Sequence, residues 1–347
     1  MTGGPPIDLA IVLAGGGGTR LWPWTGTDRP KPLLPLGGGG RTLLAATLDR
    51  LEGVVGAGRI RLQAPSDLGA RLVATDDRLG AERLDGEPSA RDTAPAVALA
   101  MARARRARSD AIVAILPADH RVEDEPAFRE SLARAASAAA AGGLVVLAVP
   151  PTGPSTRFGY VQCAAPPARG PGGAVRVRRF VEKPDAAGAR ELLERGDSFW
   201  NAGIFVWRAD VFWSALELAA PDVAGPVDAY LSDGGAPAWE RATTTSIDYA
   251  LMERADGVVA VPLDAGWDDV GSWDAVCRIA EQGDAGGAVR VDVAGDAADG
   301  SMVLEVGDGK IPRAVVLGDR PMLVVHGPEG LLVTPRADAD RVKGFIG

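Results

Sequence analysis

A run of glycines followed by two cations is the part of the sequence that most directly indicates chemistry. Gly15 to Gly18 follow the apolar segment Ile7–Leu13, and Arg20 and Lys31 come soon after them. Glycine has no side chain to hold a bulky anion away from the backbone, so successive N–H groups can point at phosphate oxygens. The two cations add full positive charge. We therefore predict that this segment cradles a triphosphate.

Two familiar phosphate-binding patterns do not fit this segment. The P-loop ends in Gly-Lys-Ser/Thr, whereas Gly18 is followed by Thr19 and Arg20. The dinucleotide fingerprint requires glycine or alanine where Arg20 stands. The alternative is a plain flexible turn. Prolines on both sides of Lys31 favour a functional role, because they restrict the backbone there and suit a lysine that is held in place.

Two aspartates farther along the chain are candidate ligands for a divalent cation. Asp119 follows the apolar segment Ala111–Leu116, and Asp269 lies in Trp267-Asp268-Asp269-Val270-Gly271. Magnesium is usually held by one or two carboxylates together with substrate phosphates and water, so Asp119 and Asp269 would suffice. Each could instead be a turn or helix-cap aspartate. Spacing alone also leaves Asp268 open as the ligand in place of Asp269.

Composition excludes several classes of protein. A chain of 347 residues with a formal net charge of −9 lacks the basic surface that nonspecific nucleic-acid binding needs. Cys163 and Cys277 are far apart and form no Cys-x-x-Cys motif, which favours a reducing, cytoplasmic setting. The segment Ile7–Leu13 is too short to span a membrane and is typical of a buried strand. His120 and His326 are poor candidates for a catalytic pair.

Short apolar runs alternate with alanine-rich stretches along most of the chain. This alternation predicts an α/β fold with a mostly parallel sheet and helices on both of its faces, in which ligands bind at the carboxyl ends of strands. The predicted strands are Ile7–Leu13, Arg59–Gln63, Ala111–Leu116, Leu144–Val149, Val175–Val181, Ile204–Trp207 and Val258–Leu263. The predicted helices are Leu43–Leu51, Ala94–Arg108, Ala127–Ala141, Ala186–Arg195, Ala209–Leu218, Ile247–Glu253 and Trp273–Glu281.

The pattern of predicted elements changes after a stretch rich in glycine and aspartate at 283–300. Short apolar runs with turns between them follow, with almost no helical pattern: Met302–Val306, Ala314–Val316, Met322–Val325 and Leu331–Val333. We therefore expect a catalytic domain over residues 1–283 and a small β-rich C-terminal domain over residues 284–347. That tail and the tryptophans are compatible with a homodimer.

Eight short motifs occur in order along the chain. They are Leu13-Ala14-Gly15-Gly16-Gly17-Gly18-Thr19-Arg20-Leu21-Trp22-Pro23, Arg29-Pro30-Lys31-Pro32, Arg91-Asp92-Thr93-Ala94-Pro95, Leu116-Pro117-Ala118-Asp119-His120, Phe180-Val181-Glu182-Lys183-Pro184, Trp200-Asn201-Ala202-Gly203-Ile204-Phe205, Ser246-Ile247-Asp248-Tyr249 and Gly266-Trp267-Asp268-Asp269-Val270-Gly271-Ser272-Trp273. Together they resemble the motifs of mannose-1-phosphate guanylyltransferases, in the family of sugar-1-phosphate nucleotidylyltransferases. The resemblance covers residues 7–280, and the tail resembles the short, β-helix-like C-terminal domain of the same enzymes.

The resemblance implies an α/β fold of the nucleotide-diphospho-sugar transferase type, with a Rossmann-like mixed, mostly parallel sheet flanked by helices. It also implies a reaction. The reaction would join GMP from GTP to mannose 1-phosphate, giving GDP-mannose and pyrophosphate with Mg²⁺ as cofactor, and it would need neither nucleic acid nor membrane. The implied catalytic residues are Arg20, Lys31, Asp119 and Asp269, of which Asp119 and Asp269 would bind the metal. The implied nucleotide-binding residues are Ala14, Gly15, Gly16, Gly17, Gly18, Thr19, Arg20, Glu87, Asp92 and Thr93. The implied sugar-phosphate residues are Gly159, Glu182, Lys183, Asn201 and Gly203.

Some positions depart from the pattern of that family. Gly17 stands where serine is usual, Asp92 where asparagine is usual, and Arg157-Phe158 where Gly-Tyr is common. Asp92 could accept a hydrogen bond from guanine, or Asp92 or Thr93 could cap the helix that follows. Glucose 1-phosphate with dTTP or UTP is therefore an alternative substrate pair. A catalytically silent regulatory homologue and a purely structural scaffold are alternatives of other classes, but neither accounts for Arg20, Lys31, Asp119 and Asp269 together.

Overall fold

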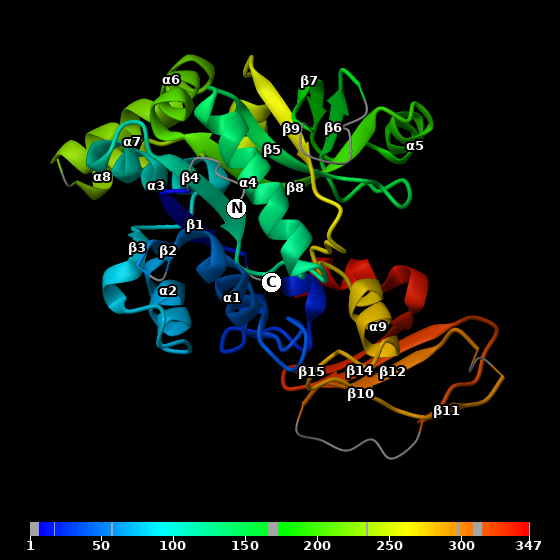
Figure 1. Cartoon of the computed structure of the whole chain (residues 1–347). Helices are drawn as coiled ribbons and strands as arrows, with labels where there is room; N and C mark the ends of the chain where they lie inside the picture. The colour runs from blue at the N-terminus through cyan, green and yellow to red at the C-terminus, as the bar shows by residue number, and fades with distance from the viewer. Residues whose placement is uncertain are drawn as a thin grey trace. The chain divides into compact units, whose positions relative to one another are not determined.

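The computed structural model describes residues 7–16, 18–56, 58–165, 173–233, 235–296, 299–307 and 314–346 (Figure 1). The chain forms two compact units. The first unit consists of Met1–Gly15, Arg50–Pro117 and Asp124–Trp267, and the second of Gly16–Asp49, Ala118–Glu123 and Asp268–Gly347. The predicted domain boundary after residue 283 does not follow this division, and residues 284–347 as a separate domain stay a prediction.

The described residues of the first unit contain a nine-stranded sheet. Its order is β3 (Leu84–Glu87), β2 (Ile60–Pro65), β1 (Leu9–Leu13), β4 (Ile112–Pro117), β8 (Ser198–Arg208), β5 (Leu144–Val149), β9 (Val258–Pro262), β7 (Val175–Val181) and β6 (Tyr160–Cys163). The first four strands of this order are parallel to one another. Strand β8 runs antiparallel to both β4 and β5, so the predicted mixed α/β sheet is confirmed and its longest parallel part is β3-β2-β1-β4.

Strand β8 begins at Ser198, earlier than the predicted strand Ile204–Trp207. The prediction missed β3 and β6. Strand β3 was missed because it carries Asp85, Gly86 and Glu87, residue types that are depleted in strands.

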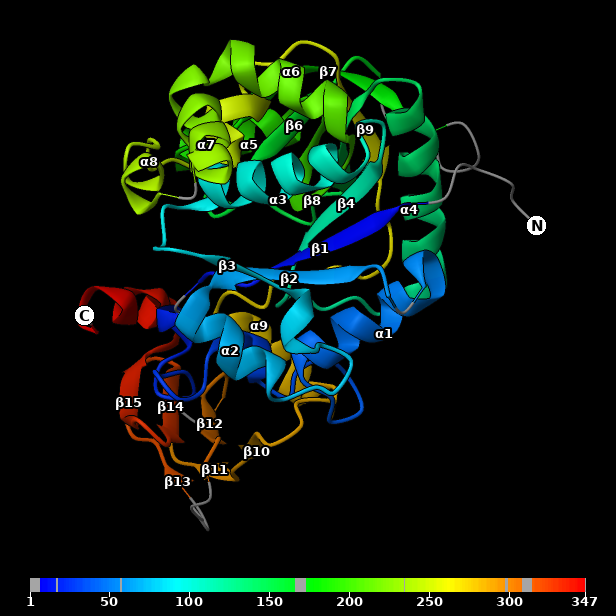
Figure 2. The same ribbon diagram turned by 90° about the vertical axis from the view of Figure 1, so that its left-hand side faces the viewer.

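The helices of the first unit lie on both faces of the sheet (Figure 2). They are α2 (Ser66–Val73), α3 (Thr93–Ala107), α4 (Glu125–Ala140), α5 (Ala186–Glu194), α6 (Ala209–Ala219), α7 (Pro221–Asp233) and α8 (Ala236–Glu240), with the short turn η3 (Ala81–Arg83). Helix α1 (Leu43–Val55) begins in the second unit and ends in the first. The sequence did not predict α2, α7 or α8; Gly225 and Pro226 within α7 are residues that argue against a helix.

Alternate residues of β4 face different helices. Val113 and Ile115 belong to the apolar cluster that includes α3 and α6, whereas α4 contacts β4, β5, β8 and β9 from the other side (Figure 2). All strand residues Ile112–Leu116 are buried, as expected for a strand covered on both faces.

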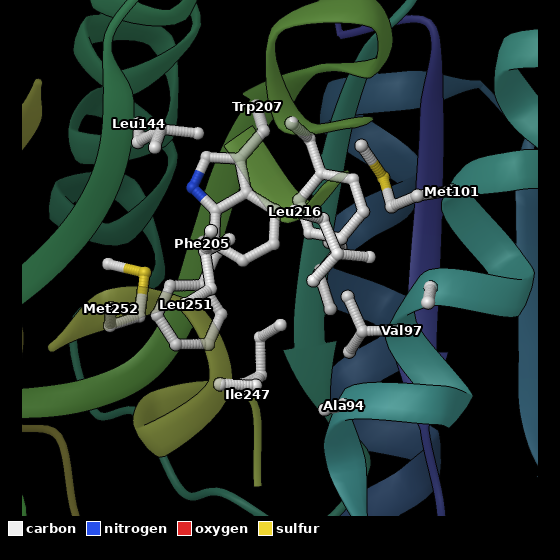
Figure 3. Packing of buried hydrophobic residues seen from close by; sticks show 14 of the residues in the cluster. Ala94, Val97, Met101, Leu144, Phe205, Trp207, Leu216, Ile247, Leu251 and Met252 are labelled. Carbon is white, nitrogen blue, oxygen red and sulfur yellow. The ribbon is translucent and has the colours of Figure 1, made fainter. Parts of the chain in front are cut away.

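Figure 3 shows the centre of this cluster, where Phe205 and Trp207 of β8 pack among apolar side chains of α3, α6 and the segment around Leu251. The indole of Trp207 stacks on Phe205 and on Phe212, with ring centroids 4.7 and 4.9 Å apart. The predicted helix Ile247–Glu253 is a single π-turn, η4 (Asp248–Met252), which packs its buried Leu251 and Met252 into this core. The core therefore fixes both β8 and η4.

The second unit combines loop segments with the C-terminal strands. It contains η1 (Thr19–Leu21), η2 (Lys31–Leu33), α9 (Trp273–Glu281) and η5 (Arg336–Gly344). One sheet has the order β10 (Val289–Arg290), β12 (Met302–Glu305), β14 (Met322–Gly327), β15 (Gly330–Pro335), and a second pairs β11 (Val293–Ala294) with β13 (Ala314–Val315). The predicted β-rich C-terminal region is confirmed. Val293 pairs with Ala314 and Met302 with Leu323 in parallel, so both pairings have the same offset along the chain.

None of the helices in the part of the chain that the structure describes combines the length and apolar character needed to cross a membrane.

Candidate active site

The glycine turn leaves β1 and has one position that only glycine suits. Gly18 has a φ of 61°, and a Cβ there would lie 2.9 Å from Lys31 Cβ and 3.3 Å from Thr25 Cγ2. The Thr25 hydroxyl donates a hydrogen bond of 2.8 Å to the Gly18 carbonyl, which fixes the turn. This close approach brings the backbone of the turn against Lys31.

The fold does not itself require glycine at the two preceding described positions. Gly15 and Gly16 are exposed, and a Cβ on either would meet nothing within 4 Å. Ala14, by contrast, is buried and its N–H donates to the Gln63 carbonyl at 2.9 Å. Gly17 lies outside the described residues. Bare backbone at Gly15 and Gly16 is what close approach of a bulky anion calls for.

A pocket in the second unit, called here the Lys31 pocket, contains seven of the predicted residues. It is lined by Gly16, Gly18, Thr19, Arg20, Leu21, Lys31, Asp119, Asp269, Gly271 and Lys343. Arg20 comes from η1, and Lys31 begins η2. All four predicted catalytic residues therefore line one pocket.

Lys31 connects the two predicted metal ligands. Its Nζ lies 2.8 Å from Asp119 Oδ2 and donates a hydrogen bond of 2.5 Å to the carbonyl of Asp269. Lys31 is only 8% exposed. Burial acts to raise the pKa of the Asp119 carboxyl, but the charges of Lys31 and His120 and the hydrogen bond from Lys31 together hold that pKa below its usual range. Asp119 is therefore an anion at neutral pH.

A two-residue bridge brings the aspartates together although they are far apart in the sequence. The N–H of Arg121 donates to the Asp268 carbonyl at 2.9 Å, and the N–H of Asp268 donates to the Arg121 carbonyl at 3.0 Å. The carboxylate of Asp268 accepts from the Val270 N–H and from Arg278, each at 2.7 Å. The Asp268 carboxylate is thus paired with Arg278, whereas Asp269, whose Oδ1 accepts from the Gly271 N–H at 3.2 Å, lines the pocket.

The donor set of the Lys31 pocket suits magnesium. Asp119 and Asp269 offer hard carboxylate oxygens, and Mg²⁺ takes one or two carboxylates with substrate phosphates and water rather than a full cage of side chains. Among the described residues there is no cluster of three or more His, Cys, Asp or Glu side chains that could hold a metal. A site of two carboxylates is consistent with that finding.

The predicted sugar-phosphate residues lie together in the first unit. Lys183, at a φ of 44°, forms an ion pair with its neighbour Glu182, whose side chain is 4% exposed. A Cβ on Gly159 would lie 2.4 Å from Glu182 Oε2 and 3.4 Å from Asn201 Cβ, so a larger residue there would displace the Glu182 carboxylate. The Gly159 carbonyl accepts from the Asn201 N–H at 2.8 Å.

The amide of Asn201 is held at both ends. Its Oδ1 accepts from the N–H of Gly203 at 2.8 Å, and its Nδ2 donates to Asp248 Oδ1 at 3.0 Å. Asp248 opens η4 and is a residue to which the sequence analysis gave no role, although the Ser-Ile-Asp-Tyr motif contains it. We call Glu182, Lys183, Asn201 and Asp248 the Lys183 cluster.

Charge is closely balanced in the Lys183 cluster. Burial, and then the charge of Glu182, raise the pKa of Asp248 to about 7. Burial acts to lower the pKa of Lys183. The hydrogen bond from Lys183 to Glu182 and the negative charge of Glu182 nevertheless raise that pKa above its usual value. Lys183 thus lies beside two acids, Glu182 and Asp248, in the site that we predict to bind the sugar phosphate.

The three remaining nucleotide-binding candidates also lie in the first unit, and each has a contact within the protein. Glu87 is buried, accepts from Gln63 Nε2 at 3.1 Å, and has a pKa raised by burial. Asp92, at a φ of 65°, precedes α3 and accepts from the Thr93 N–H at 2.6 Å. The Thr93 hydroxyl accepts from the Ile247 N–H at 2.9 Å. Asp92 therefore caps α3, and base recognition by these residues stays a prediction.

Comparisons with known proteins identify the family of the chain. Residues 9–285 match the model of the family described as nucleotidyl transferase. The xanthan biosynthesis protein XanB of Xanthomonas campestris is 34% identical over 97% of this chain and 72% of its own length. The mannose-1-phosphate guanylyltransferase of Escherichia coli is 32% identical over 97% of this chain and 72% of its own.

A solved structure is similar over the whole chain. The crystal structure of a protein named mannose-1-phosphate geranyltransferase, from Thermus thermophilus, is 33% identical, has a TM-score of 0.79, and covers 97% of both chains. With the family model matching most of the chain, this protein belongs to the nucleotidyl transferase family and is a nucleotidyltransferase.

Proposed function

We propose that this nucleotidyltransferase transfers GMP from GTP to mannose 1-phosphate and releases pyrophosphate. The observation that carries the proposal is the Lys31 pocket, where Arg20, Lys31, Asp119 and Asp269 meet beside bare glycine backbone. The choice of mannose and guanine is supported by the names of relatives, which include mannose-1-phosphate guanylyltransferase.

The reaction needs charge neutralisation more than proton transfer. The second pKa of a phosphate monoester is about 6, so the nucleophile is already mostly ionised at neutral pH. Its oxygen attacks the α-phosphorus of the nucleotide, and the bond to the pyrophosphate oxygen breaks. Catalysis therefore consists of positioning two anions and stabilising the charge that develops between them.

In this proposal the residues of the two units bind different substrates. Arg20, Lys31 and the backbone of the glycine turn bind the nucleotide phosphates, while Lys183 binds the phosphate of the sugar and Glu182 accepts from its hydroxyls. Asp119 and Asp269 would hold Mg²⁺, which when bound supplies further positive charge to the phosphates. A cytoplasmic location and a homodimer stay predictions.

A pyrophosphate-release assay tests the proposal. The enzyme is given mannose 1-phosphate or glucose 1-phosphate, each with GTP, ATP, UTP or dTTP, in the presence of Mg²⁺. We expect GTP with mannose 1-phosphate to give the highest kcat/KM. A preference for glucose 1-phosphate with UTP or dTTP would replace the substrates and keep the reaction. No turnover of any pair would overturn the proposal and favour a silent sugar-nucleotide-binding protein.

A further inference from the structure

Lys343 lines the Lys31 pocket although it lies close to the end of the chain. It belongs to η5 (Arg336–Gly344), and no motif in the sequence drew attention to it. Nothing in the proposed chemistry above uses it. The pocket thus contains a third cationic side chain besides Arg20 and Lys31.

The helix that carries Lys343 is anchored within the second unit. Ala339 belongs to the apolar cluster formed by Leu21, Trp24 and Trp273, and Val342 is 7% exposed. Segment η5 contacts η1, the segment that carries Arg20, as well as α9, β14 and β15. Lys343 therefore follows a buried residue on a packed helix and is not part of a loose tail.

The three cations of the pocket differ in their partners. Lys31 is paired with Asp119 and with the Asp269 carbonyl. Arg20 and Lys343 have no carboxylate partner among the residues that the structure describes. Two unpaired like charges on one pocket repel each other, and an anion placed among them removes that repulsion. A polyphosphate has enough charge to satisfy both.

We propose that Lys343 binds the outer phosphates of the nucleotide and the pyrophosphate that leaves, so that η5 completes the substrate site. The proposal rests on the proposed function for the identity of the polyphosphate. It assigns to the C-terminal helix a direct share in binding, because Lys343 joins Arg20 in neutralising the charge of the leaving group.

Direct titration with inorganic pyrophosphate tests this role. Lys343→Ala should bind pyrophosphate about tenfold more weakly than the wild type, the scale of one hydrogen bond to a charged group. Its KM for the nucleotide should rise similarly, while its KM for the sugar phosphate stays unchanged. Lys343→Arg should keep most of the affinity. Lys343→Gln, which keeps most of the length of the side chain without its charge, should behave as Lys343→Ala does.

Arg341→Ala is the matched control, because Arg341 is an exposed cation of the same helix that pairs with Asp338 and does not line the pocket. It should bind pyrophosphate as the wild type does. Wild-type affinity in both Lys343→Ala and Lys343→Gln, or an equal loss in Arg341→Ala, would overturn the assignment.

The titration separates this inference from the proposed function. If the wild type turns over no nucleotide but its pyrophosphate binding depends on Lys343, the proposed function fails and the inference stands. If turnover is normal and pyrophosphate binding does not depend on Lys343, the inference fails and the proposed function stands.

Discussion

Lys31 and Asp119 form an ion pair of 2.8 Å between Nζ and Oδ2 in the second unit. The same ammonium group donates to the carbonyl of Asp269, so a single lysine holds both predicted metal ligands in place. Gly18 makes this possible, because a side chain there would collide with Lys31. The glycine turn, the lysine and the aspartates therefore behave as one structural group.

Lys31→Met should lower kcat by about 100-fold, the scale seen when one transition-state donor is removed. It should also move the acid limb of the kcat–pH profile upward. The charge of Lys31 holds the pKa of Asp119 down, and without it burial raises that pKa, so Asp119 takes up a proton at a higher pH. Pre-steady-state kinetics over a pH series measures both effects. An unmoved acid limb would mean that Lys31 does not set the ionisation of Asp119.

Asp269→Asn and Asp268→Asn should have different effects. Asp269 lines the pocket, so its loss should raise the Mg²⁺ concentration needed for half-maximal rate by about tenfold or more. Asp268 is held by Arg278 and the Val270 N–H, so its loss should lower the melting temperature with little change in the metal titration. Magnesium titrations and thermal melts of both variants check this. The opposite pairing of effects would make Asp268 the ligand.

Lys183→Ala should raise the KM for the sugar phosphate by about tenfold and leave the KM for the nucleotide unchanged, because it removes one charged hydrogen bond from that substrate alone. Arg179→Ala on β7 is a suitable control, since Arg179 is exposed and carries the same charge nearby in the sequence. Steady-state kinetics with each substrate varied in turn gives the result. A rise in both KM values would point to general damage to the fold.

Local motifs predicted most residues of the Lys31 pocket, because those residues belong to short segments that can be recognised in the sequence. Glycines before Arg20, prolines around Lys31 and an aspartate after a buried strand are patterns that need no knowledge of the fold. The bridge between Arg121 and Asp268 could not be predicted, since it joins distant segments through backbone groups that every residue has. The contact of the Asp268 carboxylate with Arg278 and the place of Asp269 in the pocket, which distinguish the two aspartates, likewise come from the folded structure.

Residues whose role comes from tertiary placement were missed. Lys343 is a single lysine without a motif, and only the packing of η5 brings it to the pocket. Asp248 was part of a noted motif, but its significance comes from burial beside Glu182 and Asn201. Strand β3 was missed for a related reason, because its polar residues Asp85 and Glu87 are buried through contacts with Arg61 and Gln63 that its own sequence does not show.

Asp248→Asn should become more stable relative to the wild type as the pH rises. The pKa of Asp248 is raised from its ordinary 3.8 to about 7, first by burial and then by the charge of Glu182. Between about pH 4 and pH 7 the native state therefore keeps a proton on Asp248 that the unfolded chain has released. The contribution of this group to the free energy of unfolding is largest below about pH 4 and is lost as the pH rises through 7. Asparagine cannot ionise and can still accept from Asn201.

The difference in unfolding free energy between Asp248→Asn and the wild type should grow by up to about 4 kcal/mol over that range. Urea denaturation of both proteins at a series of pH values measures it. Asp222→Asn, at an exposed position at the start of α7, is the control and should follow the wild-type curve. A difference that stays constant with pH would show that Asp248 is ionised throughout, and the Lys183 cluster would then carry more negative charge at neutral pH than a pKa of about 7 for Asp248 implies.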